Sequence, residues 1–95
     1  MSKKIPLTKK WNVEYAISAK KEIDALDGSA RRIIKKAIED KLMTEPLKFG
    51  LPLRRSLKNF FKLRVGDYRI IYQIENEEVT VLVIKVGHRR EVYEE

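Results

Sequence analysis

The order of elements in the sequence predicts an α+β fold in which two helices pack on one face of a mainly antiparallel four-stranded sheet. The expected order is β-α-α-β-β-β, followed by a short C-terminal tail or helix. Two observations predict this: apolar residues recur at helical spacing in the first half of the chain and alternate with polar residues in the second half. Strands that are segregated from helices in this way typically form a sheet with the helices on one face.

The N-terminal half begins with a short strand and continues as two helices. Residues 11–15 alternate apolar and polar side chains, as a half-buried strand does. Apolar residues at helical spacing predict a first helix from residue 16. Asp27-Gly28 interrupts that pattern, Ser29 offers an N-cap for a second helix, and Pro46 is expected to end it.

The C-terminal half is expected to form a meander of three strands. Residues 60–65 and 68–74 alternate, and the Gly66-Asp67 pair between them suits a hairpin turn. A third strand is expected from residue 78 or 79 to Val86, where Gly87 stops it. The preceding residues 47–59 are expected to be a connecting loop.

Period-2 alternation assigns the side chains of these strands to two faces. Leu63, Tyr68 and Tyr72 share the face expected to pack against the helices. Lys62, Arg64 and Arg69 share the other face. The alternation therefore predicts a cationic sheet surface that no helix covers.

Charge and composition narrow the classes of function. The net charge is +7, from 21 Lys+Arg against 14 Asp+Glu, and the surplus lies in the first ten residues and between Arg54 and Arg90. A polyanion, either nucleic acid or an acidic protein, suits this distribution. The chain has no cysteine and one histidine, which excludes disulfides and thiolate catalysis and argues against a catalytic metal, so no metal or cofactor is expected.

The length of 95 residues suits one domain. Residues 1–10 are expected to be a basic N-terminal arm and residues 11–95 a single domain. The N-terminal segment lacks the apolar run of a signal peptide, and no apolar stretch is long enough to cross a bilayer. We therefore expect a cytoplasmic protein without a membrane partner.

Cations and hydrogen-bonding rings converge in the C-terminal half, namely Lys62, Arg64, Arg69, His88, Arg89, Arg90 and Tyr93. Such a set suits metal-free RNA cleavage, in which the 2′-hydroxyl attacks the adjacent phosphate. That reaction needs a base, groups that stabilise the phosphate charge and an acid for the leaving oxygen. Each of these residues taken alone also fits a solvated surface or a packing position, so residue chemistry by itself leaves both readings open.

Two segments add a family resemblance. FKLRVGDYRIIY (61–72) and VGHRREVY (86–93) resemble the RelE/ParE superfamily of bacterial and archaeal toxins, and within it the RelE branch. The resemblance implies a microbial-ribonuclease-like fold and an endoribonuclease that cuts messenger RNA in the ribosomal A site and so inhibits translation. It also implies a cognate antitoxin, through whose complex alone the toxin contacts operator DNA.

Roles carry over by position. The resemblance assigns Lys62 to proton transfer, Arg69 to phosphate stabilisation, Arg89 to leaving-group protonation and Tyr93 to stacking on or orienting the substrate. It assigns RNA binding to a second set of basic residues, namely Arg54, Arg55, Arg64 and Arg90.

The sequence departs from the RelE pattern at two positions. Phe60 stands where the pattern has a second strand lysine, and His88 stands where it has another basic residue. His88 could share the acid–base work, so either Lys62 or His88 could be the base. Arg89 and Arg90 are alternatives for the catalytic arginine.

Two other functions stay open at this point. ParE-like toxins share the fold but inhibit DNA gyrase by binding it, without catalysis of their own. A catalytically inert homologue would keep only the antitoxin-binding or regulatory role. The joint presence of Lys62, Arg69, Arg89 and Tyr93 favours the ribonuclease.

Overall fold

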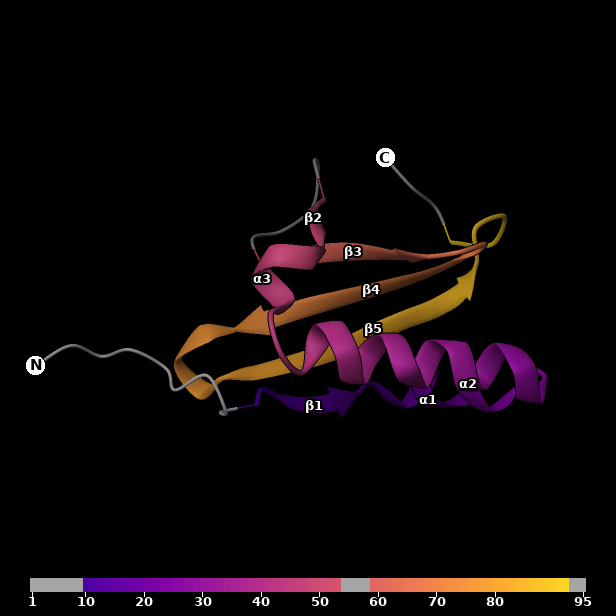
Figure 1. Ribbon diagram of the computed structural model, residues 1–95, viewed down its shortest axis with the longest axis horizontal. Coiled ribbons are helices and arrows are strands. Elements are labelled where there is room, and N and C mark those ends of the chain that lie inside the picture. Colours follow the sequence, from indigo (N-terminus) through magenta and orange to yellow (C-terminus); the bar gives the residue numbers. More distant parts are fainter. Residues whose placement is uncertain (1–9, 54–58, 93–95) are drawn as a thin grey trace, which may run out of the picture.

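The fold is a five-stranded sheet with two helices on one face (Figure 1), seen in a computed structural model that describes residues 10–53 and 59–92. The strand order is β1-β5-β4-β3-β2. β1 (Asn12–Tyr15) lies parallel to β5 (Thr80–His88). The remaining pairs, through β4 (Tyr68–Glu75), β3 (Phe60–Val65) and β2 (Leu51–Pro52), are antiparallel. The predicted α+β class is confirmed, and the predicted strand count of four is one short.

The two helices of the N-terminal half build the core against one face of the sheet. α1 spans Ile17–Asp24, and α2 spans Gly28–Ala37 and runs into a π-helical turn, η1 (Ile38–Leu42). The buried core residues come from both layers: Ala19, Ile23, Ile34, Ile38 and Leu42 on the helices, and Leu63, Ile70, Tyr72, Ile74, Val81, Val83 and Val86 on the strands. Within the described part of the chain, no helix is long and apolar enough to cross a membrane.

The start of α2 differs from the expectation. Asp27, not Ser29, is the N-cap, and its carboxylate accepts a hydrogen bond from the Ala30 backbone N–H at 2.8 Å. Both residue types make good N-caps, but the helix begins at Gly28, which leaves Ser29 inside the first turn.

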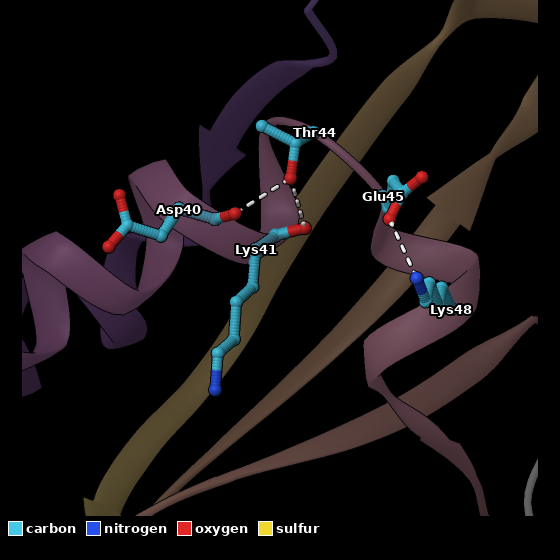
Figure 2. A network of polar contacts seen from close by, with 5 residues as sticks. All are labelled: Asp40, Lys41, Thr44, Glu45 and Lys48. Carbon is cyan, nitrogen blue, oxygen red and sulfur yellow. Dashed lines mark hydrogen bonds and ion pairs between the residues drawn. The ribbon is translucent and has the colours of Figure 1, made fainter.

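Pro46 begins a short helix, whereas the sequence pattern predicts that it ends the second helix. The helical run ends at Leu42, and Thr44 then donates its hydroxyl to the carbonyls of Asp40 (2.7 Å) and Lys41 (3.3 Å), as Figure 2 shows. A short helix, α3 (Pro46–Phe49), follows, because the fixed φ of proline and its missing N–H suit a first helical position. The first part of the predicted 47–59 loop is therefore ordered as α3 and β2.

Gly50, which leads into the edge strand β2, makes one tight contact with the core. Gly50 lies against the Tyr72 ring so closely that a Cβ at this position would overlap the Tyr72 hydroxyl. That hydroxyl donates a buried hydrogen bond to the Pro46 carbonyl at 2.8 Å. Burial also raises the pKa of Tyr72 well above its ordinary value, so the ring keeps its proton and the hydrogen bond persists.

The hairpin and the end of the meander complete the fold. Gly66 has φ +58° in the two-residue turn between β3 and β4, where a positive φ at the first central position favours glycine. The prediction that Gly87 stops the last strand is wrong, because β5 continues through Gly87 to His88. Residues 89–92 then form a turn, so the described part of the tail contains no helix.

Candidate functional site

The sheet face that points away from α1 and α2, here called the open face, carries three rows of side chains set by the strand register. The arginine row joins Arg64, Arg69 and Gly87, and the lysine row joins Leu51, Lys62 and Ile71. The aromatic row joins Phe60, Gln73, Leu82 and Glu14. Residues opposite one another in a sheet share a face and lie about 5 Å apart. The predicted cationic sheet face is therefore confirmed for Lys62, Arg64 and Arg69 on β3 and β4, and the register adds Lys85 of β5, which lies opposite Ile71.

Arg69 is the most constrained member of the arginine row. Its side chain is only 8% exposed, and Nη1 donates to the carbonyls of Gly66 and Tyr68, each at 2.9 Å. These two bonds fold the guanidinium back over the hairpin turn. Arg64 is exposed directly opposite Arg69, so two cationic side chains lie side by side at this end of the open face.

Lys62 occupies the next row and is buried, with 6% of its surface exposed. Its cross-strand neighbours are Leu51 on β2 and Ile71 on β4, both apolar. Lys62, Arg64 and Arg69 all have interaction partners within the chain. The open face is therefore cationic but largely covered around Lys62 and Arg69.

The turn after β5 folds back toward the arginine row. A Cβ on Gly87 would lie 3.1 Å from Val92 Cγ2, so the Val92 side chain lies directly over Gly87. Val92 is buried with 2% exposure. Because Gly87 pairs with Arg69, the segment 91–92 lies beside the Arg69 side chain.

His88 points to the other side of the sheet. It pairs with Tyr68, whose ring meets the imidazole edge-on at 5.7 Å and 74°. Its Nδ1 accepts a hydrogen bond from the Arg90 backbone N–H at 3.1 Å. His88 is thus separated from Lys62 by the plane of the sheet.

Arg89 and Arg90 are exposed in the turn beyond His88. The Arg89 backbone N–H donates to the Asp67 carbonyl at 2.7 Å, which ties this turn to the β3–β4 hairpin. The two arginines are thereby brought near the arginine row. Arg54, Arg55 and Tyr93 lie outside the described residues, as does most of the predicted N-terminal arm.

One polar group that supports this end of the sheet was not singled out from the sequence. Glu22 on α1 accepts hydrogen bonds from the Val86 backbone N–H (2.8 Å, Oε1) and from Lys85 Nζ (3.1 Å, Oε2). β1 ends at Tyr15, opposite Val83, so the edge of β5 beyond it has no strand partner. The Glu22 carboxylate takes the place of that strand partner. The amphipathic pattern of the helix does not predict this contact, because it marks Glu22 only as a polar position. Among residues 10–53 and 59–92, no group of three or more His, Asp or Glu side chains could hold a metal ion.

Comparison with known proteins identifies the class to which this fold and surface belong. A family model described as the ParE toxin of the type II toxin–antitoxin system parDE matches residues 13–93. The chain is a member of this family and is therefore a type II toxin. Its similarity to RelE toxins places it in the RelE group.

The relatives define the group more narrowly. Toxin RelG of Mycobacterium tuberculosis is 32% identical over 83 residues, which cover 87% of this chain and 95% of that protein. The toxin–antitoxin complex RelBE2 of the same organism contains a chain with 31% identity and a TM-score of 0.79, over 88% of this chain and 97% of that one. The isolated RelE toxin of E. coli has 26% identity and a TM-score of 0.69, over 82% and 83% of the two chains.

Proposed function

We propose that this toxin is a metal-free endoribonuclease that cleaves messenger RNA in the ribosomal A site. The observation that supports this most directly is the arrangement of Lys62, Arg64 and Arg69 on the face of the sheet that the helices leave uncovered. Guanidinium groups match phosphate oxygens and keep their charge. A lysine in the adjacent row stands beside any phosphate held there.

In the proposed reaction the nucleophile is a 2′-hydroxyl group of the RNA itself. The 2′-oxygen attacks the adjacent phosphorus as its proton passes to Lys62 Nζ, and the bond from phosphorus to the 5′-oxygen breaks. Arg69, assisted by Arg64, stabilises the additional negative charge on the phosphate. The departing 5′-oxygen receives a proton from Arg89, with Arg90 as the alternative donor. His88, which the sequence offered for acid–base work, lies on the other side of the sheet and takes no part in the proposed reaction. The products are a 2′,3′-cyclic phosphate and a 5′-hydroxyl.

Access to this surface requires a rearrangement. Lys62 and Arg69 are almost inaccessible, and Val92 lies on Gly87 next to Arg69. We propose that the turn at residues 89–92 moves away from the arginine row when RNA binds. Tyr93, which follows this turn, would then stack on or orient a base, and Arg54 and Arg55 would contact the RNA backbone.

A cognate antitoxin is the proposed protein partner. Solved relatives of this chain include the toxin–antitoxin complex RelBE2 of M. tuberculosis. An excess of basic residues suits an acidic antitoxin that binds and inhibits the toxin in the cytoplasm. Operator DNA would be bound only through that complex.

Mapping of message cleavage on translating ribosomes tests the proposal. Purified protein is added to a reconstituted translation system, and primer extension locates breaks in the message. We expect breaks in the ribosomal A site with the parent chain, and loss of these breaks with Arg69→Lys and Lys62→Met. Arg32→Lys and Lys36→Met on the exposed side of α2 serve as controls and should cleave normally.

Two other outcomes would favour the alternative functions. An intact message together with inhibited supercoiling by DNA gyrase would overturn the ribonuclease proposal in favour of a ParE-like toxin. An intact message without growth arrest would favour an inert homologue.

A further inference from the structure

Phe60 and Gln73 form a cross-strand pair in the aromatic row of the open face. Phe60 is the first residue of β3, and Gln73 lies directly opposite it on β4. Both side chains are half-buried. The pair is one step along the sheet from Lys62, which follows Phe60 by two residues and hence by about 7 Å.

The main chain fixes the position of this pair. The Phe60 carbonyl accepts a hydrogen bond from the Leu53 N–H at 3.0 Å, and the Asn59 carbonyl accepts one from the Ile74 N–H at 2.9 Å. Asn59 has φ 70°, a conformation that asparagine adopts more readily than most residues. The backbone at position 60 is thus held from both sides, so little backbone freedom remains to be lost on binding.

The ring and the amide are available to a ligand. Phe61, the next residue, stacks its ring on Tyr72 at 5.7 Å and 20° within the core. Phe60 makes no such ring contact with any described residue. No hydrogen bond joins the Gln73 amide to another described residue. The amide is also not one of the buried side-chain groups that lack a partner in the described part of the chain, so it is not fully buried. An aromatic face and an amide with both donor and acceptor therefore lie side by side on the open face.

We propose that Phe60 and Gln73 form a nucleobase subsite for the nucleotide next to the phosphate at Lys62. The inference rests on the proposed ribonuclease function and adds a determinant of substrate preference to it. A phenyl ring stacks on any base, because every base has a π-face. The amide can pair bidentately with N6–H and N7 of adenine. Guanine presents two acceptors on that edge and pyrimidines have no N7, so pairing on this edge favours adenine.

Binding of short RNA analogues tests the subsite. The probes are fluorescently labelled 2′-O-methyl pentanucleotides that differ only in the middle base, and the full-length chain is titrated by anisotropy. The blocked 2′-oxygen prevents cleavage. We expect the parent to bind the adenine probe most tightly. Phe60→Leu should weaken binding of all probes by at least about fivefold, because stacking is lost.

Three further variants separate the two roles. Phe60→Tyr keeps the ring and should bind like the parent. Gln73→Leu should keep the affinity for the weaker probes and lose the preference for adenine. Ile33→Ala, an equally apolar change on the exposed face of α2, should leave binding unchanged. Thermal unfolding of each variant checks that the fold is retained.

The outcomes distinguish this inference from the function on which it rests. Equal binding by the parent and a folded Phe60→Leu variant overturns the subsite, and so does a parent that binds none of the probes. If the parent cleaves message on ribosomes and both Phe60→Leu and Gln73→Leu leave the cleavage sites unchanged, the subsite alone is overturned. If the parent does not cleave message, the proposed function is overturned.

Discussion

Arg64 and Arg69 lie directly opposite each other on β3 and β4, on the sheet face that the helices leave uncovered. Like charges in this position ordinarily destabilise a strand pair. The Arg69 guanidinium turns back toward the carbonyls of Gly66 and Tyr68, which partly compensates its charge. The fold therefore keeps two adjacent cations on this face.

Arg69→Lys is predicted to separate the two roles of this residue. A lysine keeps the charge but cannot replace the guanidinium fork, so cleavage of message should fall by about 100- to 1000-fold, as for the loss of one transition-state donor. The unfolding free energy should fall by about 1–3 kcal/mol, because two part-buried hydrogen bonds to carbonyl groups weaken. Primer extension and urea unfolding measure the two effects. A variant that loses stability but cleaves normally would remove Arg69 from the reaction.

Glu22→Ala is predicted to loosen the end of β5. The change removes the acceptor for the Val86 N–H and the partner of Lys85, and a hydrogen bond to a charged group contributes about 1.5–3 kcal/mol. Glu22→Gln keeps an acceptor and should lose less. Hydrogen exchange of the Val86 amide measures the effect directly, and Glu77→Ala in the exposed η2 turn (Asn76–Glu78) is the control. Unchanged protection of Val86 in Glu22→Ala would show that the carboxylate does not hold this edge.

Gly50→Ala is predicted to destabilise the protein by about 1–3 kcal/mol or more. The added methyl group would overlap the Tyr72 hydroxyl, which must then move from its position in the core. Gly28→Ala is the matched control, since its nearest neighbour, Arg32 Nη1, is at an ordinary 3.6 Å. Thermal unfolding should show a lower Tm for the first variant only. Equal Tm values for both would contradict the close approach of Gly50 to Tyr72.

Tyr72→Phe is predicted to change the alkaline stability of the protein. Burial raises the folded-state pKa of Tyr72 above its unfolded value of about 10, so the contribution of its protonated form is complete below pH 10. Above that pH the unfolded state ionises first, and stability falls as pH rises toward the folded-state pKa, by at most about 1.4 kcal/mol per pH unit for this group.

Urea unfolding above pH 10 should therefore show a shallower pH dependence for Tyr72→Phe than for the parent. At neutral pH the variant should lose about 1–3 kcal/mol, because the Pro46 carbonyl loses its buried donor. Tyr15, whose pKa burial and Glu39 also raise, remains in both proteins and contributes equally. Parallel pH profiles would show that Tyr72 ionises in the folded state as readily as in the unfolded state.

The alternation of residues 60–74 was sufficient to predict the two faces of the meander, because a period of two follows directly from strand geometry. β2 could not be predicted in this way. It has only two residues, one of them proline, and it is held by the Gly50–Tyr72 contact, which joins positions far apart in the chain. The extension of β5 past Gly87 has a similar cause, since Gly87 pairs with Arg69 and Val92 covers it.

The candidate site was predictable as a set of residues but not as an arrangement. Lys62, Arg64 and Arg69 lie on one face as the pattern requires. The burial of Lys62 beside Leu51 of β2, the cover that Val92 provides next to Arg69, and the place of His88 in β5 on the opposite side of the sheet are specified by no periodic pattern. The roles of these residues in cleavage remain predictions.

A message with one 2′-deoxy substitution tests whether the 2′-hydroxyl is the nucleophile. The substitution is placed on the 5′ side of the phosphate that the toxin cuts, in a message held on purified ribosomes. We predict no cleavage at that phosphate. In the unsubstituted message we predict a 2′,3′-cyclic phosphate and a 5′-hydroxyl at the break. Cleavage of the substituted message at the same position would contradict attack by the 2′-hydroxyl.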